Sequence, residues 1–254
     1  MLPAPAGKLG VDAVTVRLPD TTTPQLRHVS LSLNPGQTLG IIGPSGSGKT
    51  TLARVIAGAL APSSGSVRLD GAEYVARTSD DLAKHIGYLP QAPSLFAGSI
   101  KENISRFDAT SGVAAADVDQ RAIAAARAAG AHDLIQHLPE GYDTVLGPFG
   151  SGVSAGQAQR IALARALYGD PVLLVLDEPN SNLDQEGEAA LMTAIRGAAA
   201  RGAAVVLVAH RAGILSLVDR LATMAGGIIQ FEGPREEVLA RLRSSTPAVL
   251  ARPQ

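Results

Sequence analysis

One stretch of the sequence has residue types and a spacing suited to holding a phosphate: Gly43, Pro44, Ser45, Gly46, Ser47, Gly48, Lys49 and Thr50, followed by Thr51. It fits the phosphate-loop pattern Gly-x4-Gly-Lys-Thr without a mismatch. The glycines let successive backbone N–H groups point inward at a phosphate, and the helix that follows directs its positive end there. Lys49 can then reach the β- and γ-phosphates of a nucleotide, and the Thr50 hydroxyl can ligate Mg²⁺. An ordinary Gly/Ser turn between a strand and a helix is the alternative, so other motifs must support the site.

A second motif follows an apolar run at residues 172–176, which is typical of a parallel strand buried on both faces. The run ends in Asp177 and Glu178, at the edge where open α/β sheets bind ligands. Asp177 would hold the Mg²⁺ shell, and Glu178 would accept a proton from the attacking water or orient it. A solvated Asp-Glu turn is the alternative, which the upstream phosphate loop disfavours.

A third motif is the capping box formed by Ser154 and Gln157, which precedes an apolar-periodic helix beginning near Ile161. The simplest interpretation is a good helix start. A Ser hydroxyl and free N–H groups at a helix start also form an anion site, and the two interpretations are compatible.

Composition limits the possible functions of the 254 residues. The net charge is −1, with 22 basic and 23 acidic residues, so no nucleic-acid-binding surface is indicated. Cysteine is absent, which excludes thiol chemistry and disulfides. No apolar run approaches the roughly 20 residues of a membrane helix, and the start lacks the apolar segment of a signal peptide, so we expect a soluble, unexported chain.

Apolar patterns and turns predict an α/β fold with an inserted helical part. Strands are expected at residues 11–18, 29–33, 38–42, 66–70, 86–89, 172–176, 204–209, 221–224 and 228–231. Helices are expected at residues 51–57, 80–85, 117–129, 131–137, 185–201 and 235–243. The domain boundaries that we predict are a linker at 1–8, a first core part at 9–91, a helical subdomain at 92–168, a second core part at 169–243 and a tail at 244–254.

Together, these motifs resemble the nucleotide-binding domain of an ABC transporter across almost the whole chain. The loop at residues 43–50 is similar to Walker A, and residues 172–178 are similar to Walker B. Gln91 is similar to the Q-loop glutamine, which senses Mg²⁺, and residues 154–157 are similar to the signature motif. The D-loop then corresponds to residues 181–184, ending in Asp184, and the switch histidine to His210. The implied fold is a P-loop NTPase core of mixed sheet and flanking helices, with an N-terminal antiparallel β subdomain and an α-helical insert.

Residues 95–104 resemble an exporter segment, and residues 166–184 resemble type I secretion ATPases. The resemblance implies ATP and Mg²⁺ as cofactors and a homodimer in the ATP-bound state. It also implies a transmembrane domain as partner, a periplasmic adaptor and an outer-membrane channel reached through the full transporter, and a place at the cytoplasmic face of the inner membrane. In such a dimer Lys49, His210 and the opposite copy's Ser154 and Gly156 would stabilise the γ-phosphate, while Thr50, Gln91 and Asp177 would surround the metal.

Three departures from the family pattern stand out. Ala155 replaces a Gly of the signature, which we expect to be tolerated unless that position needs a positive φ. Pro148 lies where exporters carry a Glu, which affects cross-talk with the membrane domain. Leu18 or Pro19 replaces the aromatic that stacks on adenine, so selectivity for ATP over GTP should be low.

Other functions remain open at this stage. A lipid or drug exporter would share the same motifs. A DNA-repair or translation ATPase would carry coiled-coil insertions or two cassettes, and neither fits this length. A regulatory module that binds nucleotide without hydrolysing it is the remaining alternative.

Overall fold

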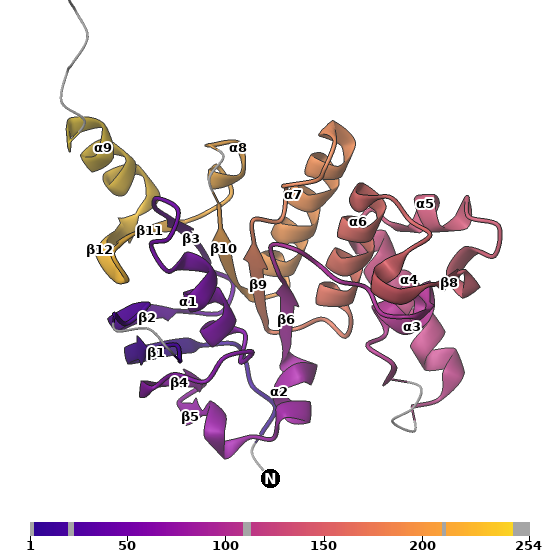
Figure 1. The fold of residues 1–254 in the computed structure, drawn as a ribbon, viewed down its shortest axis with the longest axis horizontal. Helices are drawn as coiled ribbons and strands as arrows, with labels where there is room; N and C mark the ends of the chain where they lie inside the picture. The colour runs from indigo at the N-terminus through magenta and orange to yellow at the C-terminus, as the bar shows by residue number, and fades with distance from the viewer. Residues whose placement is uncertain (1–2, 20–22, 109–112, 210–211, 246–254) are drawn as a thin grey trace, which may run out of the picture.

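The computed structural model describes residues 3–19, 23–108, 113–209 and 212–245. A six-stranded sheet in the order β12-β11-β3-β10-β9-β6 forms its centre (Figure 1). Its strands are β3 (Thr38–Ile42), β6 (Ile86–Leu89), β9 (Leu173–Asp177), β10 (Ala204–Val208), β11 (Arg220–Ala225) and β12 (Ile228–Pro234). All neighbouring strands are parallel except β12, which pairs antiparallel with β11. The expected mixed sheet is confirmed.

The central strands β9 and β10 are buried along their whole length, as the continuous apolar runs predict. Successive side chains of a strand point to opposite faces. Leu174 and Leu176 accordingly join the core on the side of the helical insert, whereas Leu173 and Val175 join the core on the other side. The sheet therefore separates two hydrophobic cores, and the polar residues that follow β9 emerge between them.

An antiparallel sheet in the order β2-β1-β4-β5 packs on one side, as expected for the N-terminal part. Its strands are β1 (Leu9–Val16), β2 (Leu26–Leu33), β4 (Ser64–Leu69) and β5 (Ala72–Glu73). Helix α1 (Lys49–Ile56) contributes Leu52 and Ile56 to the core that this sheet shares with the central sheet. Helix α1 therefore packs against side chains of both sheets. This packing holds in place the phosphate loop that leads into the helix.

The helical insert lies at the other end of the molecule (Figure 1). Its elements are α3 (Ile100–Ile104), α4 (Ala115–Ala128), α5 (His132–Gln136), η3 (Gly141–Asp143), η4 (Pro148–Gly150) and α6 (Ala155–Leu167), with the two-residue strands β7 (Gly98–Ser99) and β8 (Val145–Leu146). These short strands, which pair with each other, were absent from the sequence prediction. Helix α6 packs along β6 and α7 (Gln185–Ala200), so the insert is attached to the edge of the central sheet.

The remaining elements are η1 (Tyr74–Ala76), α2 (Ser79–His85), α8 (Ala212–Leu215) and α9 (Arg235–Ser245). Helix α9 extends two residues beyond the predicted 235–243 and so enters the predicted tail, of which residues 246–254 lie outside the described ranges.

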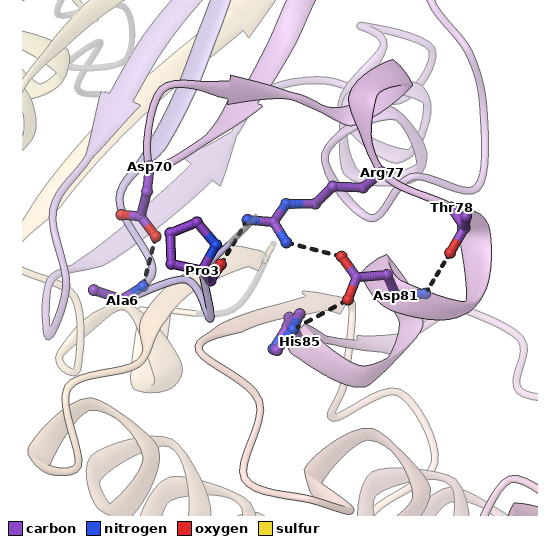
Figure 2. Close-up of polar contacts among 7 residues, drawn as sticks. All are labelled: Pro3, Ala6, Asp70, Arg77, Thr78, Asp81 and His85. Atoms are coloured by element: carbon purple, nitrogen blue, oxygen red, sulfur yellow. Dashed lines mark hydrogen bonds and ion pairs between the residues drawn. The ribbon is translucent and has the colours of Figure 1, made fainter. Parts of the chain in front are cut away.

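The segment before β1, predicted to be a linker, is bound to the core in the structure. The Asp70 carboxylate accepts hydrogen bonds from the N–H groups of residues 6–8, at 2.5, 3.1 and 2.9 Å. Figure 2 shows the Arg77 guanidinium between this segment and α2, where it donates to the Pro3 carbonyl at 3.2 Å and to Asp81 at 2.8 Å. The chain therefore enters the domain along a defined path.

Within the described ranges, every helix is too short or too polar to cross a lipid bilayer.

Candidate nucleotide-binding site

The phosphate loop follows β3 and ends at the first residue of α1. Gly46 and Gly48 adopt positive φ angles of 75° and 99°, and Gly48 is the N-cap of α1. A Cβ atom at Gly43 would lie 2.2 Å from the Met224 carbonyl oxygen, so only glycine fits there. The backbone of the loop is therefore wrapped around the start of α1, as phosphate binding requires.

Lys49 points back into this loop. Its ammonium group donates hydrogen bonds to the carbonyls of Gly43 and Pro44, both at 2.9 Å, and the residue is 5% exposed. Burial lowers the pKa of Lys49, while the carboxylates of Glu178 and Asp177 act in the opposite direction. The loop's own carbonyls thus hold the cation where a phosphate would be bound.

Asp177 is the last residue of β9 and is fully buried. Neither carboxylate oxygen accepts a hydrogen bond of normal geometry from the described residues, although the Thr50 side chain is close enough to favour the charged form. Burial outweighs this and raises the pKa of Asp177. A buried carboxylate with unused oxygens beside the phosphate loop suits a bound cation.

Glu178 and Gln91 come together across 87 residues of sequence. The Gln91 side-chain amide donates to a carboxylate oxygen of Glu178 at 3.0 Å. Glu178 has a φ of 49°, a left-handed backbone that costs a non-glycine residue about 1–3 kcal/mol. Its N–H donates to the Val208 carbonyl at 3.0 Å, which helps to hold the strained residue. The structure therefore aims the carboxylate at the loop through a fixed turn.

These residues share one pocket of about 300 Å³, lined by Gln25, Ser45, Gly46, Gly48, Lys49, Thr50, Thr51, Gln91 and Glu178. Most of the predicted phosphate-loop residues are thus placed together with Gln91 and Glu178. Gln25 was missed by the sequence analysis, because it follows a turn and belongs to no recognisable motif. Its carbonyl oxygen approaches Gly48, where a Cβ would lie at 2.8 Å.

Ser154 and its neighbours lie elsewhere in the fold. Ser154 caps α6 by accepting from the Gln157 N–H at 3.3 Å, and Gln157 accepts from the Ser154 N–H at 2.8 Å, so the predicted capping box is confirmed. A second pocket of about 310 Å³ is lined by Leu134, Ser154, Gly156, Gln157, Arg160, Asn182, Leu183 and Asp184. The two pockets share no lining residue, so the candidate site residues of one chain form two separate groups.

Three other sequence expectations concern single positions. His210 lies outside the described residues. Ala155 is the first residue of α6 and has a helical backbone. The position therefore does not need the positive φ that would make an alanine harmful there. Pro148 opens the short helix η4, where the next residue, Phe149, has a φ of 58° and is 92% exposed.

The donor set fits a magnesium ion held together with nucleotide phosphates. Within the described part of the chain, no group of three or more His, Cys, Asp and Glu side chains converges to form a complete metal site. The hydroxyl of Thr50, the amide of Gln91 and the buried carboxylate of Asp177 are the hard oxygen ligands that Mg²⁺ prefers, with the rest left to water and substrate.

A phosphate loop between a parallel strand and a helix, with an acidic residue at the end of another parallel strand of the same sheet, is typical of P-loop nucleotide-binding proteins. The comparison with family models is more specific: residues 26–181 match the model described as ABC transporter. The chain therefore belongs to the ABC transporter family.

Individual relatives agree with this placement. The chain is 49% identical over 243 residues to a type I secretion system ATP-binding protein, PrsD, of Rhizobium meliloti (strain 1021), covering 95% of this chain and 40% of that protein. It is 40% identical over 239 residues to the cyclolysin secretion/processing ATP-binding protein CyaB of Bordetella pertussis (strain Tohama I), covering 94% and 33%. A bacterial Atm1-family ABC exporter solved with ATP bound superposes with a TM-score of 0.82 at 29% identity, covering 95% and 41%. The chain thus spans well under half the length of these proteins.

Proposed function

We propose that this chain hydrolyses Mg-ATP to power the export of polypeptides by a type I secretion transporter. The observation that supports hydrolysis most directly is the 3.0 Å hydrogen bond between Gln91 and Glu178 at the mouth of the phosphate loop. A carboxylate held in this way next to a phosphate cradle can orient a water molecule for attack. The type I class is supported by the names of the relatives that cover 94–95% of this chain.

In the proposed reaction Glu178 polarises the attacking water, and its fixed turn keeps the carboxylate in line with the γ-phosphate. Lys49 leaves the loop carbonyls and binds the β- and γ-phosphates, which replaces two neutral acceptors by charged ones. Thr50, Gln91 and Asp177 would hold Mg²⁺, which supplies neutralisation of the phosphate charge when bound. His210, by resemblance, contacts the γ-phosphate.

Two copies are needed for the complete site in this proposal. The second pocket contains the helix start at Ser154 and Gly156. Because the two pockets share no lining residue, we infer that this helix start would not act on a phosphate bound in the first pocket of the same chain. A head-to-tail dimer would place this positive helix end against the γ-phosphate bound at Lys49 of the opposite copy. ATP would then join the two copies, and hydrolysis would separate them.

The experiment is the solution mass of Glu178→Gln with and without Mg-ATP, beside phosphate release by the wild type. The glutamine oxygen can still accept from Gln91, so the variant keeps the local geometry while losing the base. We expect an ATP-dependent dimer of Glu178→Gln, and wild-type hydrolysis well above that of a Lys49→Ala control. A wild-type rate equal to that of Lys49→Ala would refute hydrolysis and favour the regulatory module.

The membrane partner would contact the helical insert. Three large apolar side chains are exposed around the β7–β8 pair and η4: Phe96 at 59%, Val145 at 69% and Phe149 at 92%. We expect them to contact a transmembrane domain, placing this chain on the cytoplasmic face of the inner membrane, with the adaptor and outer-membrane channel reached through that domain. Loss of type I export in a native host carrying Phe149→Asp, with phosphate release by the isolated chain unchanged, would support this interface. Unaffected export would contradict it.

A further inference from the structure

One buried side chain links the two groups of site residues: Gln159, on the helix that begins after Ser154. We propose that Gln159 is a positioning residue, which holds the turn containing Glu178 and so ties this catalytic carboxylate to the helix that binds the opposite copy's nucleotide. The inference rests on the proposed function for its catalytic consequence, but its structural part can be measured without nucleotide.

The geometry of the contact is direct. Gln159 is 1% exposed, and its amide nitrogen donates to the carbonyl oxygen of Pro179 at 2.8 Å. Pro179 follows Glu178 and has no N–H group, so its carbonyl is the backbone group through which this residue can form a hydrogen bond. The next link is the N–H of Ser181, which donates to the Glu178 carbonyl at 3.3 Å. The Gln159 side chain, which comes from a different element, therefore helps to hold the turn that contains the left-handed Glu178.

The side-chain oxygen of Gln159 indicates why this position carries an amide. Its oxygen is buried and accepts no hydrogen bond from the described residues. The reversed amide would place its oxygen against the Pro179 carbonyl oxygen and lose this hydrogen bond, so the hydrogen bond fixes the orientation of the amide. An apolar residue of the same size would avoid an unpaired oxygen. The amide therefore serves its contact to Pro179 rather than the packing of the helix.

The adjacent residue, Arg160, makes a second link to the same segment. Its guanidinium donates to a carboxylate oxygen of Asp184 at 2.9 Å and lies 3.7 Å from that of Glu186. Asp184 in turn caps α7 by accepting from the Gly187 N–H at 2.8 Å. Consecutive residues of α6 thus hold both ends of the segment from Pro179 to Asp184.

Movement of α6 must therefore be transmitted to Glu178. The helix start at Ser154 is five residues, less than one and a half turns, from Gln159, so the two move as one rigid unit. Nucleotide contact at Ser154 would set the position of the Pro179 carbonyl and with it the aim of the carboxylate. In this way the position of Glu178 in each copy would depend on the nucleotide bound at Lys49 of the opposite copy.

The test replaces Gln159 by Met, which keeps the length and volume but removes the donor. We expect kcat for ATP hydrolysis to fall roughly thirtyfold, because the contact is lost and the Pro179 carbonyl is left buried without a partner. The KM for ATP should stay within about threefold, since the phosphate loop is untouched. In the nucleotide-free chain, amide hydrogen exchange at residues 178 and 181 should accelerate at least about tenfold, with exchange in β9 and α6 unchanged.

Gln136→Met, an exposed amide on α5, is the matched control and should change none of these quantities. If Gln159→Met does not fold, Gln159→Asn serves instead, because its shorter amide cannot reach Pro179. Wild-type kcat and exchange in the variant would overturn the proposal, as would a fall in kcat matched by exchange throughout the chain. If the wild type itself releases no phosphate, the proposed function fails, and exchange at residues 178 and 181 still decides whether Gln159 holds the turn.

Discussion

Asp177→Asn should stabilise the protein while removing its response to magnesium and ATP. The carboxylate is fully buried and lacks hydrogen bonds of normal geometry among the described residues, so folding must dehydrate a charge. The cations Arg54 and Lys49 favour the charged form, but burial outweighs them and raises the pKa. The folded chain therefore favours a neutral side chain at this position, and Asn supplies one of nearly the same shape.

The magnitude follows from the cost of leaving buried groups unpaired. An unsatisfied charged group costs about 1–2 kcal/mol more than a neutral one. For a chain of this size, 1 kcal/mol corresponds to about 2–4 °C in Tm. We therefore expect Asp177→Asn to melt about 2–8 °C higher than the wild type at neutral pH in EDTA. The cost of burying the charged Asp177 carboxylate appears as the pH rises from its ordinary pKa of 3.8 through its raised pKa in the folded chain. The difference in melting temperature between Asp177→Asn and the wild type should therefore disappear as the pH falls toward 4.

The assay is thermal unfolding in EDTA and in saturating Mg-ATP. Mg-ATP at about one hundred times its Kd should stabilise the wild type by about 2.7 kcal/mol and the variant by much less. Asp12→Asn, which removes an exposed carboxylate from β1, is the control and should leave both melting temperatures unchanged. A melting temperature of Asp177→Asn below that of the wild type in EDTA would refute the reasoning, because Asp177 would then be stabilising without a cation.

Three further changes test other parts of the structure. Gly43→Ala places a Cβ 2.2 Å from the Met224 carbonyl and should reduce ATP affinity at least about tenfold in a titration, and an unchanged Kd would show that the loop can move aside. Asp70→Ala removes the acceptor of three N–H groups in residues 6–8, which should lower the free energy of unfolding by about 1–3 kcal/mol and open this segment to proteases. Ala155→Gly should not raise the rate of ATP hydrolysis and should cost up to about 1 kcal/mol in a denaturant titration, since the position is already helical; a faster enzyme would contradict this.

The fold could be predicted from the sequence because its signals are local. The apolar run that becomes β9, the glycines of the phosphate loop and the capping box at Ser154 each follow from residue type and spacing alone. Lys49 and Glu178, which the structure places in one pocket, could be predicted as candidate site residues for the same reason. The two-residue strands β7 and β8 were not found, because a pair of residues has no period to detect.

Contacts between distant segments could not be predicted in this way. The support of Pro179 by Gln159 depends on how α6 packs against β6 and α7, and no motif marks a glutamine in the second turn of a helix as a partner for a particular carbonyl. The binding of residues 6–8 to Asp70 is similar: a start rich in Pro and Ala is typical of a linker, and the acceptor that holds it lies more than 60 residues away.

The two departures from the family pattern in the helical insert differ in their consequences. Ala155 has a helical backbone and an exposed side chain, so the extra methyl group neither strains the chain nor displaces a neighbour. Pro148 instead begins a turn in which Phe149 takes a left-handed backbone and projects its ring into the solvent. An exposed aromatic ring interacts less favourably with water than a charged side chain does, and it gains packing contacts when a partner covers it. Under the proposed function, we therefore expect Pro148 and Phe149 to offer the membrane domain an apolar surface in place of a charged one.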